Sequence, residues 1–249
     1  MEMNLGPRVI IMFPNGFYIT ETVVWAVIVA VGMILYAVLS TRRMEKVPRG
    51  IQVVNEMIVE TVYNFVKNTM GPHCKAFAPY IGTLFLFLII NNALGMLPGA
   101  NGAPSRAATA DMNFTFAMGV LVFFLIQINS IRSKGGLGYI KHFAEPLPFM
   151  VPLKILEEVT FPISLSFRIF GNILAGVIIM DLFFHLMHFL SEKVLGAFGE
   201  QVPVFQAVIP LFPNAFFDMF EPFLQAFVFC MLTMSFIGRA VAPHEEHAA

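Results

Sequence analysis

Long apolar stretches separated by short polar connections make up most of this chain. A helix needs about 20 consecutive apolar residues to cross about 30 Å of hydrocarbon, and several stretches reach that length. Hydrophobic residues are 57% of the 249 and charged residues only 12%, whereas a soluble domain carries about 25% charged residues. The alternating pattern of an outer-membrane barrel is not seen. We therefore expect an all-α integral membrane protein with a single membrane domain over residues 1–249.

Five membrane spans are expected, over residues 17–40, 79–98, 113–131, 155–190 and 203–241. The fourth is longer than a bilayer is thick, since at about 1.5 Å per residue it would form a helix of about 54 Å. The fifth contains four prolines, which favour kinks. We expect these two helices to be steeply tilted and paired as a hairpin. Residues 99–112 and 132–154 are expected to be loops, the second a basic one.

Residues 48–70 have a different pattern from the spans. Pro48 suits the first turn of a helix, and Glu56, Glu60, Tyr63 and Lys67 recur at spacings of three and four among apolar residues. This spacing predicts an amphipathic helix that lies in the membrane interface.

Lysine and arginine are distributed unevenly along this topology. With the N-terminus outside, eleven fall on the inner side, Arg8, Arg106 and Lys193 fall outside, and Arg168 lies within the membrane, which accounts for all 15. The positive-inside tendency then predicts an outer N-terminus and a cytoplasmic C-terminus. The expected location is the inner or plasma membrane of a cell. The chain does not open on a signal-peptide pattern, so we expect no cleaved signal.

Arg168 has no acidic residue within nine positions on either side. Its guanidinium stays charged, since the pKa of arginine exceeds about 12, and insertion scales give a cost of about 2.5 to 3.5 kcal/mol at mid-helix. An intramembrane charge of this kind indicates a function, with an ion pair to another helix of the same chain as the alternative. Asn172, Ala175 and Gly176 continue the same stripe, and small side chains there would let another helix approach closely.

A second stripe on this helix carries Asp181, His185 and His188 at spacings of four and three. These groups could line a hydrated cavity, supply three ligands of a metal site, or reach the membrane surface. The absence of a further ligand pattern favours the cavity, and we expect no bound metal. Cys74 and Cys230 are expected to be free thiols.

Three polar residues of the final span, Asp218, Glu221 and Gln225, are spaced at i, i+3 and i+7 and are expected to share one face. Carboxylates at membrane depth are rare unless they face water or a partner, so this face predicts an aqueous path, with a helix–helix hydrogen bond as the alternative. Glu157 and Glu158 precede Arg168 by about three turns, near the expected cytoplasmic end. A functional role and simple solvation are equally open for these two.

Two motifs resemble the signature stretches of subunit a of F-type ATP synthases: SLSFRIFGNILAG at 164–176 and LQAFVF at 224–229. NNALGMLPG, TADMN and SKGGLGYIKHF, followed by PLKILEEVTFPISL, agree with the family in the same order. The resemblance extends from about residue 48 onward. It implies that the family's essential arginine is Arg168, its asparagine four residues later is Asn172, and the glutamine of its last helix is Gln225.

The chain departs from the family at Val177, nine residues after the arginine, where Glu or His is usual. We expect Asp181, one turn further along the same face, to replace that group. Asp218 stands seven residues before Gln225, a position that is often His or Glu in the family. Glu221 adds a second carboxylate one turn closer to the glutamine.

The resemblance implies a fixed subunit beside a rotating ring of c subunits, each of which carries a membrane-buried carboxylate, with b subunits of a peripheral stalk as further partners. Protons would reach the ring through two offset half-channels, coupled to ATP synthesis. The outer half-channel would be lined by Asp218, Glu221, Asp181 and His185, and the inner one bordered by Glu157 and Glu158. The chain contains no Walker-type phosphate loop, so we expect the nucleotide chemistry to reside in other subunits. We also expect no catalysis, nucleotide binding, nucleic-acid binding or cofactor in this subunit itself.

A secondary transporter that binds an anionic substrate at Arg168 is the main alternative. Such folds often contain internal repeats with broken helices, and neither half of this sequence visibly repeats the other. An intramembrane hydrolase would need a nucleophile beside a base, and no motif joins Ser164 or Ser166 to His185.

Overall fold

The computed structural model describes residues 9–14, 16, 18–42, 44–94, 107–144, 149, 151–196, 205 and 209–241. Within these ranges, the side chains of residues 137, 140–144, 195, 211, 215, 218 and 219 are outside the described part. The beginning of the predicted last span, residues 203–208, is described only at Phe205, and the expected loop 99–112 only from residue 107.

The protein is mostly helical, with six long helices in the described part: α1 (Glu21–Thr41), α2 (Ile51–Met70), α3 (Ala78–Leu94), α4 (Met112–Ala144), α5 (Val151–Leu195) and α9 (Glu221–Val241). Short elements are the 3-10 helices η1 (Pro72–Phe77) and η2 (Ala108–Ala110), α8 (Leu211–Ala215), and the π-helical turn η4 (Phe216–Phe220). Five helical segments are long and apolar enough to cross a membrane: 21–41, 72–94, 112–136, 151–194 and 221–241. The expected all-α membrane fold is confirmed.

The first span begins later than predicted, because residues 18–20 are not helical. Strands β1 (Val9–Met12) and β2 (Tyr18–Thr20) form an antiparallel hairpin ahead of α1. Thr20 ends the second strand and caps the helix, since its side-chain oxygen accepts a hydrogen bond from the Val23 amide. The sequence pattern of residues 9–20 did not predict this hairpin.

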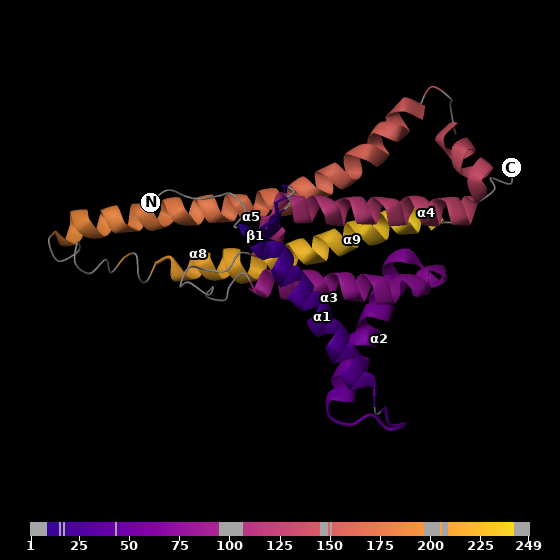
Figure 1. Cartoon of the computed structure of the whole chain (residues 1–249), viewed down its shortest axis with the longest axis horizontal. Helices are drawn as coiled ribbons and strands as arrows, with labels where there is room; N and C mark the ends of the chain where they lie inside the picture. The colour runs from indigo at the N-terminus through magenta and orange to yellow at the C-terminus, as the bar shows by residue number, and fades with distance from the viewer. Residues whose placement is uncertain are drawn as a thin grey trace.

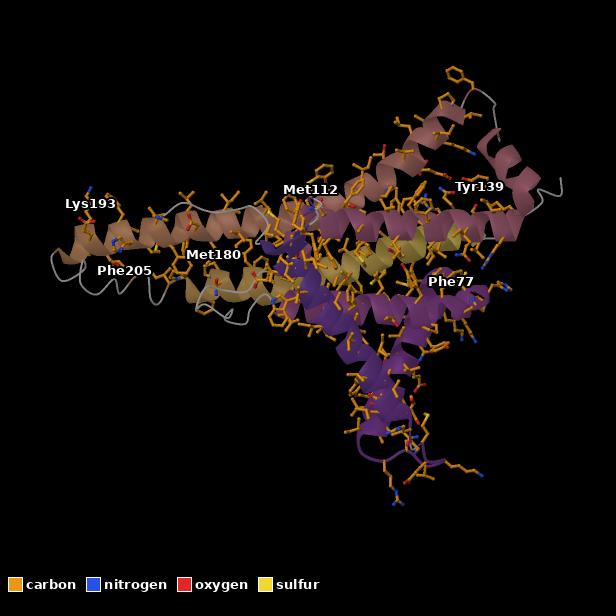
Figure 2. All side chains as sticks on the ribbon, in the orientation of Figure 1. Phe77, Met112, Tyr139, Met180, Lys193 and Phe205 are labelled. Carbon is orange, nitrogen blue, oxygen red and sulfur yellow. The ribbon has the colours of Figure 1, made fainter. Side chains whose placement is uncertain are left out.

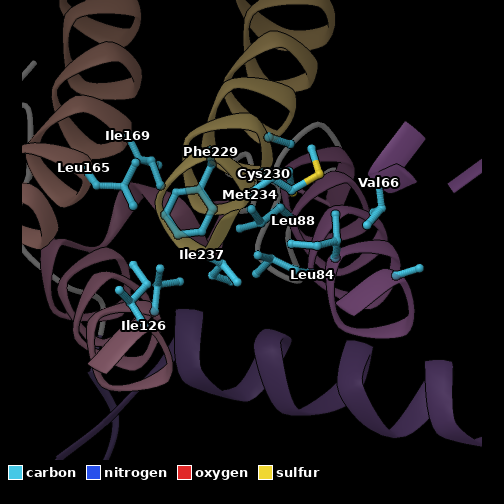
Figure 3. Packing of buried hydrophobic residues seen from close by; sticks show 14 residues of the cluster. Val66, Leu84, Leu88, Ile126, Leu165, Ile169, Phe229, Cys230, Met234 and Ile237 are labelled. Atoms are coloured by element: carbon cyan, nitrogen blue, oxygen red, sulfur yellow. The ribbon is translucent and has the colours of Figure 1, made fainter. Parts of the chain in front are cut away.

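Helix α9 lies in the middle of the bundle and contacts α2, α3, α4 and α5. Figure 1 shows α3, α4 and α9 running alongside one another, while α1 and α2 diverge from them as two arms of a V. Phe229, Met234 and Ile237 of α9 are fully buried and pack among apolar side chains of the surrounding helices, including Leu88 and Leu165 (Figure 3). Apolar packing therefore fixes α9 among α2, α3, α4 and α5.

Helix α5 is continuous over 45 residues, about 68 Å at 1.5 Å per residue. It bends along its length, as Figure 1 shows, so that its amino-terminal part rises away from α4. Pro162 lies inside the helix and cannot donate to the carbonyl one turn earlier, which favours a bend. The helix begins and ends a few residues beyond the predicted 155–190.

The prediction of a loop over 132–154 is wrong for its first part, because helical structure continues to Ala144. The helix is broken at Gly135, whose φ of 73° and ψ of 160° are non-helical. That positive φ suits glycine, and a second glycine follows directly. The break turns the segment after Gly135 away from the axis of α4 (Figure 1).

The last apolar stretch is divided into α8, the π turn and α9 rather than forming one helix. Pro222 supplies a physical reason, because its ring would clash with the carbonyl of residue 218 in a regular α-helix and has no N–H to donate to it. The wider π turn over Phe216–Phe220 relieves this conflict. It also alters the spacing between Asp218 and Gln225, so the expected shared face does not follow from α-helical geometry.

Helices α4 and α5 approach each other closely at Gly119. A Cβ atom placed there would lie 2.8 Å from the Pro162 carbonyl oxygen and would also overlap the Ser166 hydroxyl. That hydroxyl is itself held between the Pro162 carbonyl at 2.7 Å and the Thr115 carbonyl at 3.1 Å. The absence of a side chain at Gly119 therefore sets the distance between α4 and the part of α5 that leads to Arg168.

We predict that Gly119→Ala destabilises the protein by about 1 to 3 kcal/mol, because the backbone of α5 must move to accommodate the methyl group. The matched control is Gly32→Ala in α1, where nothing lies within 4 Å of the new Cβ. Thermal unfolding of the detergent-solubilised protein measures both. Equal midpoints for the two variants would contradict the close contact.

Candidate functional site

Arg168 lies on the exposed face of α5. Leu165, Ile169 and Met180 are buried against the bundle, whereas Arg168 and Asn172 are exposed, as are Ala175 and Ile179 further along the same stripe. Within the part of the chain that the structure describes, the Arg168 guanidinium has no hydrogen bond or ion pair. The alternative of an ion pair to another helix of this chain therefore gains no support.

Asn172 joins α5 to α9 one turn beyond the arginine. Its Nδ2 donates to Oε1 of Gln225 over 2.7 Å. Gln225 is only 5% exposed, and its own Nε2 has no partner among the described residues. Near this bridge, a Cβ at Gly176 would lie 3.1 Å from the ring of Phe217. Two of the sequence-predicted residues thus meet, and a small residue lets the two helices approach.

Asp181 and His185 lie together further along α5. The His185 Nδ1 is 3.7 Å from Oδ2 of Asp181 and 2.8 Å from its backbone carbonyl. His188 is exposed one turn away. Across the described ranges, no three His, Cys, Asp or Glu side chains gather closely enough to hold a metal ion. The arrangement is a partly exposed carboxylate–imidazole pair, and among the described residues no hydrogen bond links it to Gln225.

Polar side chains gather where α3 ends and α9 begins. Asn92, nearly buried in α3, donates from Nδ2 to the Pro222 carbonyl over 3.3 Å and accepts a hydrogen bond from the Thr109 hydroxyl. Glu221 is half-buried, and its Oε1 has no partner among the described residues. The side chain of Asp218 lies outside the described part. A buried acceptor without a donor is a place where a water molecule or proton would be stabilised.

Glu158 is held by two side chains of α4 at the opposite end of the bundle. Gln127 donates from Nε2 to Oε2 of Glu158 over 2.7 Å, and the Tyr139 hydroxyl lies 2.6 Å from Gln127 Oε1 and 3.3 Å from the same carboxylate oxygen. Tyr139 lies in the segment after Gly135, and the break at that glycine places it near Glu158. Figure 2 shows it beside the end of α4. The carboxylate is therefore fixed between α4 and α5 rather than simply solvated.

Glu157, by contrast, is well exposed. Its Oε1 lies 3.7 Å from Nη1 of Arg239 near the end of α9, and both side chains are more than half exposed. Such a surface pair contributes about 0 to 1 kcal/mol. The two adjacent glutamates thus have different surroundings, which their positions in the sequence do not distinguish.

The sequence did not indicate a contact for Gln127, Tyr139 or Asn92. In the sequence, Asn92 stands within a family motif and Tyr139 within the expected basic loop. The signal available for Gln127 and Asn92 is an amide side chain inside an apolar span, which indicates a partner on another helix. Tyr139 had no such signal, because its contact depends on the turn at Gly135.

Together these features define a multi-pass helical membrane protein with a cationic side chain on the open face of a long bent helix and polar clusters at both ends of the bundle. A family model described as ATP synthase A chain matches residues 23–238. The chain belongs to the ATP synthase subunit a family, whose members take part in proton transport in the membrane sector of F-type ATP synthases.

Curated relatives agree over most of their length. ATP synthase subunit a of Moorella thermoacetica is 32% identical over 231 residues, which cover 93% of this chain and 94% of the relative. The subunit a proteins of a Geobacter species and of Citrifermentans bemidjiense are each 32% identical over 244 residues, with 96% of this chain and 94% of the relative covered.

Tyr139 provides a pH-dependent prediction. Burial, together with the neighbouring Glu158 carboxylate, raises the pKa of Tyr139 from 10 to about 12. A raised pKa in the folded state stabilises the protein below pH 10, and that contribution is lost as the pH rises toward 12. Tyr139→Phe should therefore lower stability by about 1 kcal/mol at neutral pH, with no change between about pH 6 and pH 9 and a smaller difference above about pH 10.

Thermal unfolding of the purified protein across this pH range measures the effect. Tyr36→Phe is the matched control, because the Tyr36 hydroxyl donates to Asn55 over 2.7 Å at an exposed site between α1 and α2. A Tyr139→Phe effect no larger than that of Tyr36→Phe would show that the contact with Glu158 contributes nothing.

Proposed function

We propose that the chain is the stationary ion-channel subunit of a rotary F-type ATP synthase and that Arg168 faces the rotating c-ring. The observation that carries this proposal is an exposed guanidinium, without a partner in the described part of its own chain, on a stripe with Asn172 and Ala175. An arginine within a membrane span needs a negative or polar partner. A ring of helices that each carry one carboxylate would supply such partners in succession.

The electrostatics explain why this position needs arginine. Two unit charges about 4 Å apart interact by about 4 kcal/mol at an effective dielectric of 20, enough to favour an ionised ring carboxylate as it passes. The carboxylate loses its proton near Arg168 and regains one after moving on. Because the guanidinium stays positive, it also opposes direct proton flow between the two half-channels, so translocation requires rotation.

The outer half-channel is proposed to include Asp218, Glu221, Asp181 and His185. The Glu221 Oε1 atom, which has no hydrogen-bond partner among the described residues, supports a hydrated environment at the start of α9. Asp181 and His185 form a pair on α5 that can exchange a proton with water. Asp181 thereby replaces the Glu or His expected at Val177.

The inner half-channel is proposed to be bordered by Glu157 and Glu158. Glu158 is held by Gln127 and Tyr139, so its carboxylate has a defined position about three turns before Arg168. The exposed Glu157 lies beside it, 3.7 Å from Arg239. The distribution of lysine and arginine along the sequence supports a cytoplasmic location for this end and hence an outer N-terminus.

The proposed partners are the c-ring and peripheral-stalk b subunits, in the inner or plasma membrane of a cell. Nucleotide chemistry would take place in other subunits. Family membership favours this function over a transporter that binds an anionic substrate at Arg168, because the relatives that match nearly the whole chain carry the name ATP synthase subunit a.

Cross-linking in native membranes tests the orientation of α5. Cysteines at the exposed positions Ala175 and Ile179 should form cross-links to a small hairpin subunit, whereas cysteines at the buried positions Ile169 and Met180 should not. Background cross-linking through Cys74 and Cys230 is expected to be low, since both are buried. The proposal fails if the buried and exposed positions cross-link alike, or if Ala175 and Ile179 contact only lipid.

Proton pumping driven by ATP tests the role of Asp181. Asp181→Asn should slow pumping at least tenfold, about 1.4 kcal/mol in activation free energy, and Arg168→Ala should abolish it, because each removes a charged group from the proposed proton path. Glu192→Gln, an exposed carboxylate near the end of the same helix, serves as the control and should pump normally. Normal pumping by Asp181→Asn in an assembled complex would rule out its role as the substitute carboxylate.

A further inference from the structure

The hairpin ahead of α1 is joined to the membrane spans at one end. Thr20 ends β2 and caps α1, and the Thr22 hydroxyl donates to Oδ2 of Asp111 over 2.8 Å. The other oxygen of Asp111 accepts a hydrogen bond from the Asn113 amide in the first turn of α4. The stem of the hairpin is therefore fixed at the level where two membrane spans begin.

The hairpin is apolar on both of its faces. Ile11 pairs with Ile19 and Met12 with Tyr18 in regular register, so these two side chains point to opposite sides, whereas a bulge between Val9 and Ile11 interrupts the alternation before them. The exposed fractions are 46% for Ile11 and 75% for Met12, and Val9 and Ile10 are 44% and 56% exposed. Tyr18 on β2 is also half exposed. A hairpin docked on one protein surface would need an apolar face only on that side.

Strand geometry limits how far the hairpin can extend. At about 3.3 Å per residue, four residues span about 13 Å, so its tip stays close to the level at which α1 begins. A two-stranded hairpin is at best marginally stable in water. Its unpaired backbone edges are also incompatible with the hydrocarbon core, where no water can satisfy them. Between these two environments lies the lipid headgroup layer.

We propose that this hairpin is an interfacial anchor that inserts into the headgroup layer of the membrane leaflet at which α1 and α4 begin. Lipid surrounds both apolar faces, and the headgroups and their water satisfy the backbone edges. Tyr18 and Trp25 belong to the aromatic residues that favour this depth. The anchor fixes the position of α1 along the membrane normal. This helix packs only lightly against the bundle, since 17% of the residues in its apolar window are buried. The inference depends on the membrane spans and not on the ion path.

Tryptophan fluorescence of the full chain, reconstituted into phosphatidylcholine vesicles, tests the depth of the hairpin. Trp25 is the sole tryptophan, so Trp25→Phe provides a silent background. Ile11→Trp and Met12→Trp are then introduced separately, because they lie on opposite faces of β1. Val31→Trp, at an exposed position in the middle of α1, is the matched control for a deep, lipid-facing site.

Lipids brominated near the glycerol backbone should quench both hairpin tryptophans more than lipids brominated near the bilayer centre, and the order should reverse for Val31→Trp. Aqueous iodide should quench the hairpin tryptophans only weakly. Strong quenching by iodide without quenching by lipid would overturn the proposal, as would protection of one face from both quenchers. Proton pumping is not measured, so this result is independent of the proposed channel function.

Discussion

A permanently charged side chain within a membrane span is the constraint on which this structure depends. Several other polar groups in the spans find neighbours: Asn172 reaches Gln225, Gln127 reaches Glu158, and Asn92 reaches the Pro222 carbonyl. Arg168 has no such neighbour among the described residues and lies on the open face of α5. Because hydrocarbon does not solvate a guanidinium, this face requires a companion protein or water.

The rest of the bundle holds that face in place. Leu165 and Ile169, on either side of Arg168, are 2% exposed and pack into the core around α9. Gly119 lets α4 approach α5 directly, two residues before the arginine at Ser166. The hydrogen bond between Asn172 and Gln225 then fixes α5 relative to α9 on the other side. The charge is presented from a rigid backbone, which suits an interaction with a succession of passing groups.

Much of the fold could be predicted from the sequence, because hydrocarbon thickness and apolar run length determine helical spans almost alone. The family resemblance assigned Asn172 and Gln225 to the ion path, but the hydrogen bond between them is a finding of the structure. The hairpin at residues 9–20, the helix after Gly135 and the contact of Tyr139 with Glu158 could not be predicted. Each depends on a local backbone turn or on a tertiary contact, neither of which leaves a periodic signal.

The π turn at Phe216–Phe220 has a consequence for how the last segment interacts with water. In a regular helix the carbonyl of residue 218 would be occupied by the amide of residue 222, but a proline there leaves a main-chain oxygen without its helical donor. That oxygen lies about one turn from Glu221, whose Oε1 has no hydrogen-bond partner among the described residues. A hydration point on the main chain here would depend on Pro222, because any other residue at that position would restore the missing amide donor.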